Sequence, residues 1–234
     1  MKKLIAFDLD GTLSQHKTPI NDVNRGVLTE LSKKYRLLML GAGACRRIYD
    51  QLRQFPIDIV GSYGMQQSVV TDGRFIVVRD ESYTVDHEYF NATVASLRKK
   101  LSLNFYYGDS VEFHASGLVT FPILGTAAPL SEKLAYDPDR SKRRAMYDTV
   151  KNAFPDFNVF IGGSSSYDIS KKQFNKFFAL KRYCDENSIA LSDALFVGDD
   201  FGDGGNDSAI RLGGVDYVEV ECYEHFPDKV AFLL

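Results

Sequence analysis

The stretch Leu4-Ile5-Ala6-Phe7-Asp8-Leu9-Asp10-Gly11-Thr12-Leu13 begins with four apolar residues and continues into two aspartates that lie two positions apart. A run without a polar member predicts a strand that is buried on both faces, as in a parallel sheet. Open α/β sheets carry out their chemistry at the carboxyl ends of such strands. We therefore expect Asp8 and Asp10 to lie at a functional edge of a parallel sheet.

Apolar runs alternate with helix-like stretches through the first third of the chain. Residues 37–40 and 57–60 have the composition of further strands, and apolar residues at helical spacing occupy the segments between the strands. Residues 174–184 and 194–197 resume this pattern as a helix and a strand. The alternation is typical of βαβ units and predicts an α/β fold with a doubly wound, Rossmann-like parallel sheet.

The pattern changes from about residue 66. Two apolar runs flank Asp72-Gly73, a dipeptide suited to a tight hairpin turn with positive φ. Further on, helices are expected over residues 86–101 and 141–154, and strands within residues 111–123, 158–161 and 167–170. We predict a catalytic core formed by residues 1–82 and 173–234, with an α+β cap domain inserted over residues 83–172.

Composition narrows the class of protein. With 234 residues, 44% hydrophobic content and 17 Phe, the chain can fill a sizeable interior. A net charge of -3 argues against a general nucleic-acid binder, because phosphate backbones are bound mainly through clustered Lys and Arg. Three scattered cysteines form neither a disulfide framework nor a zinc site. No stretch has the pattern of a signal peptide or a membrane span, so we expect a cytoplasmic protein without a membrane partner.

A second acidic cluster, residues 198–207, follows the strand expected at residues 194–197. Asp199 stands directly at the end of that strand, where its carboxylate can complete a metal site with Asp8 and Asp10. Carboxylate oxygens are the ligands that Mg²⁺ prefers, and a magnesium ion would neutralise charge between a phosphate ester and an attacking aspartate. One aspartate can then form an aspartyl-phosphate while its neighbour transfers protons. Further candidate ligands in the same loop are Asp203, Asn206 and Asp207.

A calcium-binding EF-hand loop is the rival interpretation of this second cluster. Its third loop position would be Phe201 and its twelfth Ile210, and neither side chain can coordinate a cation. The rival is therefore excluded.

Two other segments have weaker signals. Lys176, at the start of a core helix, is a candidate partner for a phosphate or a nucleophile because it lies between the two acidic clusters in the sequence. The loop Gly41-Ala42-Gly43-Ala44 precedes a helix, so its amides are candidates for cradling a phosphate. Neither the dinucleotide fingerprint nor a nucleotide P-loop fits this loop. The basic run over residues 140–144 is expected to be a solvated helix start.

These motifs, in the order in which they occur, resemble the haloacid dehalogenase superfamily over nearly the whole chain. More narrowly, the ending Gly204-Gly205-Asn206-Asp207 and the segments 112–123 and 162–168 are similar to the phosphomannomutase branch, which has an α+β (type C2) cap. The resemblance implies an enzyme that transfers phosphoryl groups of sugar phosphates or similar small phosphometabolites. It also implies, by analogy with related mutases, a homodimer formed through the caps.

The resemblance assigns roles to individual residues. It implies Asp8 as the nucleophile, Asp10 as the general acid and base, and Lys176 as the charge-balancing lysine. Asp199 would bind Mg²⁺ together with Asp8 and the backbone carbonyl of Asp10. On the cap, the positions expected to touch the sugar phosphate are Ser166 and Asp168.

Two departures from the family pattern favour hydrolysis. The superfamily usually places a hydroxyl where this chain has Ala42 and Gly43, a loss of about 1.5–3 kcal/mol that would slow turnover. The arginines with which phosphomannomutase caps hold a second phosphate correspond here to His114, Thr126 and Lys133. A phosphatase does not need that second grip, so a Mg²⁺-dependent phosphatase is the leading expectation. The alternatives are a phosphomannomutase and a non-catalytic sugar-phosphate-binding protein.

Overall fold

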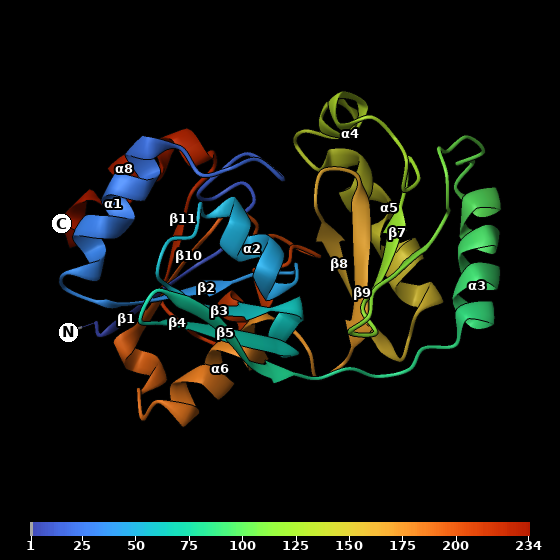
Figure 1. Ribbon diagram of the computed structural model, residues 1–234. Coiled ribbons are helices and arrows are strands. Elements are labelled where there is room, and N and C mark those ends of the chain that lie inside the picture. Colours follow the sequence, from blue (N-terminus) through green and yellow to red (C-terminus); the bar gives the residue numbers. More distant parts are fainter. Residues whose placement is uncertain (1) are drawn as a thin grey trace. The chain divides into compact units, whose positions relative to one another are not determined.

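The computed structural model describes residues 2–234, which divide into two compact units (Figure 1). The first unit comprises the residues up to Glu81 together with Phe174–Gly202 and Asp207–Leu234. The second comprises Ser82–Gln173 and Asp203–Asn206, so part of the second acidic cluster groups with the inserted segment. That these units are a catalytic core and a cap domain stays a prediction.

The first unit is built on a seven-stranded sheet with the order β11-β10-β1-β2-β3-β4-β5. Its parallel strands are β1 (Leu4–Phe7), β2 (Arg36–Leu40), β3 (Asp58–Gly61), β10 (Ala194–Gly198) and β11 (Tyr217–Glu219). Two antiparallel strands complete the sheet, β4 (Gln66–Thr71) and β5 (Arg74–Asp80). Strand order runs outward from β1 in both directions, which is the topology of a doubly wound sheet.

Helices cover both faces of this parallel sheet, as the unbroken apolar run of β1 predicts. The helices are α1 (Asp22–Ser32), α2 (Cys45–Gln51), α8 (Phe226–Lys229), α6 (Lys176–Glu186) and α7 (Ser208–Leu212). On one face of the sheet, Ile5 and Phe7 pack in a core cluster with residues of helices α1, α2 and α8. On the other face, Leu4 and Ala6 pack in a second cluster with residues of helices α6 and α7. Short 3₁₀ turns are η1 (Ser62–Gly64), η2 (Leu191–Asp193), η3 (Tyr223–His225) and η4 (Ala231–Leu233). The predicted α/β fold class is confirmed.

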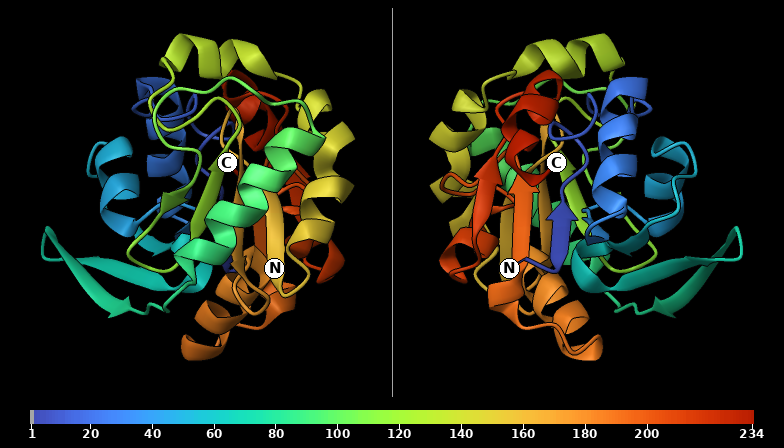
Figure 2. Two further views of the ribbon diagram at one scale, coloured as in Figure 1. Left: turned by 90° about the vertical axis from the view of Figure 1, so that its right-hand side faces the viewer. Right: turned by 90° about the vertical axis from the view of Figure 1, so that its left-hand side faces the viewer.

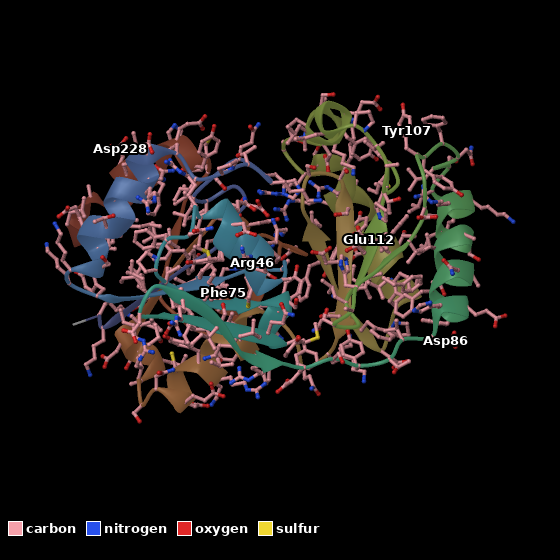
Figure 3. The ribbon with its side chains drawn as sticks, viewed as in Figure 1. Arg46, Phe75, Asp86, Tyr107, Glu112 and Asp228 are labelled. Carbon is pink, nitrogen blue, oxygen red and sulfur yellow. The ribbon has the colours of Figure 1, made fainter. Side chains whose placement is uncertain are left out.

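The hairpin predicted around Asp72-Gly73 is also present. Asp72 and Gly73 have φ angles of 50° and 70°, so they form the tight turn between β4 and β5. Figure 2 shows this hairpin projecting from its sheet as a two-stranded ribbon. Phe75 fixes it to helix α2, because its ring stacks on Tyr49 at 4.7 Å and lies 5.6 Å from the guanidinium of Arg46 (Figure 3).

The second unit has a four-stranded antiparallel sheet with the order β6-β7-β9-β8. The strands are β6 (Glu112–Phe113), β7 (Val119–Pro122), β8 (Phe157–Gly162) and β9 (Ser166–Lys171), and the helices are α3 (His87–Lys100), α4 (Leu130–Tyr136) and α5 (Ser141–Ala153). Asp86, which is labelled in Figure 3, lies at the start of α3 and caps it by accepting a hydrogen bond from the amide of Tyr89. Phe90, Val94 and Leu97 form the apolar face of α3 and pack in one core cluster with residues of the sheet.

Alternation along β9 separates an apolar face from a polar one. Tyr167 and Ile169 join the core cluster that includes residues of α3 and α5. Ser166, Asp168 and Ser170 therefore lie on the opposite face of the strand. Ser166 and Asp168, which the resemblance assigns to the sugar phosphate, thus share the face of β9 opposite to the one that packs on the helices.

No helix in the part of the chain that the structure describes combines the length and the apolar character needed to cross a bilayer.

Candidate active site

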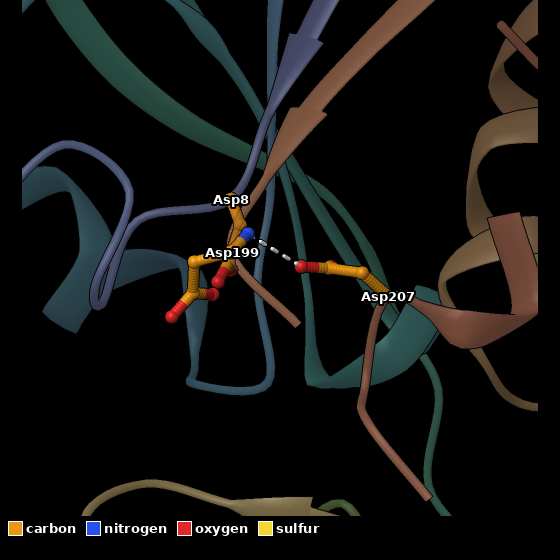
Figure 4. Close-up of side chains that lie close together, drawn as sticks. All are labelled: Asp8, Asp199 and Asp207. Carbon is orange, nitrogen blue, oxygen red and sulfur yellow. Dashed lines mark hydrogen bonds between the residues drawn. The ribbon is translucent and has the colours of Figure 1, made fainter. Parts of the chain in front are cut away.

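Two neighbouring parallel strands bring their following aspartates to the same edge of the sheet. Asp8 follows β1 and donates its amide to the carbonyl of Val197 in β10 at 2.8 Å, and Asp199 follows β10 directly. Asp207 joins them from the start of α7. One carboxylate oxygen from each of the three lies within 4.8 Å of the others (Figure 4). The structure therefore brings together acids that are nearly 200 positions apart in the sequence.

Lys176 completes this cluster from the first turn of helix α6. Asn175 caps that helix by accepting from the amide of Phe178 at 2.9 Å, which places the lysine at the helix start. The Nζ atom lies 2.8 Å from Asp8 Oδ1 and 2.6 Å from Asp207 Oδ1, and the residue is fully buried. Burial opposes its charge, but the carboxylates of Asp207 and Asp8 hold the pKa of Lys176 above its usual range.

Asp207 organises the loop around Asp199. Its Oδ2 accepts hydrogen bonds from the amides of Asp199 at 3.0 Å and Asp200 at 3.1 Å, the first of which is drawn in Figure 4, while its Oδ1 contacts Lys176. Both oxygens of Asp207 are thus engaged by the protein. Asp207 holds Lys176 and Asp199 in register, which leaves Asp8 and Asp199 as the carboxylates best suited to bind a cation.

Excess negative charge in the cluster affects Asp8. The pKa of Asp8 is raised to about 6, mainly by burial, with the charge of Lys176 opposing the rise and the charge of Asp207 adding to it. Three carboxylates share one lysine here, so a further cation would stabilise the ionised form of Asp8.

The glycine of the first motif is required by close packing. Gly11 has a φ of 100°, and a Cβ atom at this position would lie 2.1 Å from Asp199 Oδ2. Any side chain would therefore meet the carboxylate as well as backbone strain. Gly11 permits the two acidic loops to approach each other.

Asp10 lies in a separate network of hydrogen bonds and charges. Its Oδ1 accepts from the amide of Lys17 at 2.9 Å and from Gln51 Nε2 at 2.7 Å, while Arg47 Nη2 lies 3.3 Å and His16 Nδ1 3.6 Å from its Oδ2. Burial would raise the pKa of Asp10, but His16, Arg47 and Gln51 together hold it well below its usual range. None of these three partners was predicted from the sequence. The four-residue spacing of Arg47 and Gln51 on α2, which places them on one helix face, was the available signal.

The loop predicted to cradle a phosphate is partly occupied by the protein itself. The amide of Gly41 donates to Val60 O at 3.0 Å, and the amide of Cys45 donates to Gln66 Oε1 at 3.0 Å. Within residues 2–234, no protein acceptor is bonded to the amides of Ala42 and Gly43. Together with the amide of Ala44, for which the same holds, these are the donors that the loop can offer to a ligand.

The second unit holds the remaining predicted site residues. His114 Nε2 lies 3.0 Å from Thr120 Oγ1, which in turn donates to Asp168 Oδ1 at 3.1 Å, so His114 and Asp168 belong to one polar chain. Ser166 Oγ donates to Gly162 O at 3.0 Å, and Lys133 Nζ donates to Thr126 O at 2.9 Å. Asp203 and Asn206 also belong to this unit rather than to the unit with Asp8. That any of these residues binds substrate stays a prediction.

One expectation for the basic run at residues 140–144 was wrong. Arg143 is not solvated: its side chain is 1% exposed, and its Nε donates to Asp137 Oδ2 at 2.7 Å. Its Nη1 donates to the carbonyls of Gly162 at 2.7 Å and Gly163 at 3.0 Å. Arg143 thereby fixes the turn that leads into β9 and its residue Ser166.

The comparisons with known proteins agree with this geometry. A sequence model of the family described as eukaryotic phosphomannomutase matches residues 26–214, a range that includes Lys176, Asp199 and Asp207. The chain belongs to this family. The phosphomannomutase of Saccharomyces cerevisiae is 24% identical over 218 residues, which cover 88% of this chain and 84% of the yeast protein. That of Spinacia oleracea is also 24% identical, over 87% of this chain and 84% of its own.

Solved structures of other proteins have the same fold as this chain of the phosphomannomutase family. An N-terminally truncated, IMP-bound IMP-nucleotidase of Plasmodium falciparum superimposes with a TM-score of 0.73 at 14% identity, covering 99% of this chain and 68% of the nucleotidase. A haloacid dehalogenase-like hydrolase from B. subtilis superimposes with a TM-score of 0.62 at 17% identity, over 93% of this chain and 88% of the hydrolase. The predicted resemblance is confirmed: the protein is a phosphoryl-transfer enzyme of the phosphomannomutase family, and its fold is that of a haloacid dehalogenase-like hydrolase.

Proposed function

We propose that this enzyme transfers the phosphoryl group of a small sugar phosphate through an aspartyl-phosphate on Asp8. The observation that carries the proposal is the buried cluster in which Asp8, Asp199 and Asp207 meet around Lys176. Family membership favours the interconversion of hexose 1-phosphate and hexose 6-phosphate, because the relatives that match this chain over most of their length are named phosphomannomutases.

The donor set of the cluster fits Mg²⁺. Carboxylate oxygens are the hard ligands that this ion selects, and the three carboxylates exceed the charge of the single lysine among them. Asp8 and Asp199 would hold the ion together with the backbone carbonyl of Asp10. When bound, the ion supplies positive charge that offsets the negative charges of the carboxylates and the phosphate.

The chain's own residues then divide the chemistry between them. A carboxylate oxygen of Asp8 forms a bond to phosphorus as the bond from phosphorus to the sugar oxygen breaks. For Asp10 to give that oxygen a proton, substrate binding must displace the contacts with His16, Arg47 and Gln51 that hold its pKa low. In the second half-reaction, Asp10 takes the proton of an incoming hydroxyl as that oxygen forms a bond to phosphorus and Asp8 is released. General acid and base assistance of this kind typically contributes about 10²–10⁴ in rate.

Hydrolysis, the leading expectation from the sequence, becomes the second candidate. A mutase must bind a sugar bisphosphate in both orientations, and this requires cations that hold the phosphate far from Asp8. In the second unit, Arg143 donates to the carbonyl of Gly162 and Arg98 to the carbonyl of Pro122, each at 2.7 Å. Because backbone carbonyls already occupy donors of both arginines, these side chains are poorly placed to hold a second phosphate. This observation favours hydrolysis.

One assay separates the two candidates. The purified enzyme is incubated with a hexose 1-phosphate, Mg²⁺ and a catalytic amount of the hexose 1,6-bisphosphate, and isomerised sugar phosphate and orthophosphate are measured separately. We expect isomerisation to exceed phosphate release. Dominant phosphate release would establish the hydrolase instead, whereas binding without turnover would support a non-catalytic sugar-phosphate-binding protein.

The nucleophile is tested by Asp8→Asn. This change removes the attacking carboxylate, so we expect both activities to fall by on the order of 10⁴-fold or more. Asp228→Asn, at an exposed position in helix α8, is the matched control and should keep full activity. Equal activity of Asp8→Asn and the control would rule out an aspartyl-phosphate at this position.

Two expectations from the sequence remain part of the proposal. They are a cytoplasmic location and a homodimer formed through the second unit, and size determination in solution tests the latter.

A further inference from the structure

The guanidinium of Arg47 occupies the space beside Gly43, at the carboxyl end of strand β2. A Cβ atom built on Gly43 would lie 2.2 Å from Arg47 Nη2 and 2.4 Å from its Nε. The side chain remains 38% exposed, and Nη1 donates to Gln51 Oε1 at 2.7 Å. The partly exposed guanidinium of Arg47 therefore fills the space that a side chain at position 43 would occupy.

This guanidinium lies at the same sheet edge as the nucleophile. Strand β2 pairs in parallel with β1, so Gly43 and Asp8 both follow neighbouring strand ends. Arg47 Nη1 and Nη2 lie 3.4 and 3.3 Å from Asp10 Oδ2, two residues beyond Asp8. Charge-assisted hydrogen bonds are usually about 2.7–2.9 Å long, so this pairing is loose and open to exchange.

Negative charges at this edge of the sheet outnumber the single positive charge of Lys176, so a second cationic side chain would stabilise a bound phosphate. Lys176 is already in contact with two carboxylates, those of Asp8 and Asp207. A phosphate brings further negative charge to a cluster in which acids already outnumber the lysine. Arginine suits this task because its planar fork matches two phosphate oxygens at once.

We propose that Arg47 binds the phosphoryl group that Asp8 accepts, and that Gly43 is the residue that makes room for it. The proposal rests on the proposed function, which supplies the phosphorylated substrate. In this arrangement the guanidinium moves from Asp10 to the phosphate oxygens when the substrate binds. It then supplies the hydrogen bonds that a hydroxyl side chain at position 43 would otherwise donate. The weaker phosphate grip expected from Ala42 and Gly43 is then compensated by a side chain one helical turn further along.

The test measures binding of inorganic phosphate by titration calorimetry in the presence of Mg²⁺. Arg47→Ala should weaken phosphate binding by about 10- to 100-fold, since a charge-assisted pair is lost. The neighbouring Arg46→Ala is the matched control and should bind as the unaltered enzyme does, because Arg46 packs on Tyr49 and Phe75. Arg47→Lys keeps the charge without the fork and should lose less affinity than Arg47→Ala.

A double variant tests the pairing of positions 43 and 47. Gly43 does not have a positive φ, so serine fits its backbone once the guanidinium is removed. Gly43→Ser combined with Arg47→Ala should regain about tenfold in phosphate affinity over Arg47→Ala alone, because the hydroxyl supplies a donor again. Unfolding temperatures of all variants establish that the binding changes do not reflect unfolding.

The results distinguish this proposal from the proposed function. Phosphate binding that is unchanged in Arg47→Ala, or equally weakened in Arg46→Ala, would overturn the role of Arg47 even if sugar phosphates are turned over. Arg47-dependent phosphate binding in an enzyme that turns over no sugar phosphate would retain the role and reject the substrate class.

Discussion

Each of the two units contains a fully buried cation, Lys176 in the first and Arg143 in the second, and the two have opposite uses. Lys176 in the first unit contacts the carboxylates of Asp8 and Asp207 within a cluster that also contains Asp199. Arg143 in the second unit pairs with a single carboxylate, that of Asp137, and gives its other donors to backbone carbonyls.

The difference shows where charge has been left unbalanced. Around Arg143 one positive charge meets one negative charge, and the remaining donors stabilise a turn of the chain. Around Lys176 the acids are in excess, which is an unfavourable arrangement for an empty protein interior and a favourable one for a site that receives a cation. The surroundings of Lys176 are therefore suited to catalysis, and those of Arg143 to stabilising the fold.

Removing the lysine should break the first centre with the largest effect. Lys176→Met leaves Asp8 and Asp207 buried without their cation, so we expect a loss of about 3–5 kcal/mol in the free energy of unfolding. Loss of the group that orients Asp8 should also lower kcat by about 10²–10³. Denaturant unfolding and the sugar phosphate assay measure the two effects.

Lys181→Met is the control for this change, since Lys181 lies on the same helix with a 52% exposed side chain that pairs with Asp185. It should alter stability by less than about 1 kcal/mol and leave kcat unchanged. A Lys176→Met protein as stable and active as Lys181→Met would mean that the buried charges do not depend on Lys176.

Removing the arginine should affect stability without reaching the chemistry at Asp8. Arg143→Met strands the carboxylate of Asp137 and should cost about 3 kcal/mol, measured by denaturant unfolding. Adding Asp137→Asn removes the stranded charge, so the double variant should recover part of this loss. The kcat of the sugar phosphate assay, measured at saturating substrate, should change by less than about tenfold. A loss of rate as large as that of Lys176→Met would show that Arg143 has a role beyond the turn.

The fold could be predicted largely from the sequence because the pattern of apolar and turn-forming residues along the chain determines the strands and turns. Apolar runs without polar members identified β1 and β10, and the Asp72-Gly73 pair located the hairpin turn. Both signals are local, since they depend on burial along one strand or on the φ angles of two residues. Strand β11 and the helices near the carboxyl end have short, irregular patterns and were therefore not predicted.

The candidate site was only partly accessible from sequence. Asp199 was found because it directly follows an apolar strand, where topology fixes its position, and Lys176 because it lies between the two acidic clusters in the sequence. Arg47 and Arg143 have long side chains whose direction depends on neighbours distant in sequence, such as Gly162 for Arg143 and Asp10 for Arg47. Their charge was visible in the sequence, but their burial and partners follow from tertiary packing.

The smallest predicted effect sharpens the comparison, because it tests how tightly the acidic centre is packed. Gly11→Ala places a methyl group 2.1 Å from the position of Asp199 Oδ2 at a φ of 100°, so we expect a loss of about 1–3 kcal/mol in stability. The same substitution at Gly26, inside helix α1, meets no atom within 4 Å and should stabilise the protein by about 0.5–1 kcal/mol. Thermal unfolding of the two variants should therefore shift in opposite directions. If Gly11→Ala also raised the unfolding temperature, the two acidic loops would not approach as closely as the cluster around Asp8 requires.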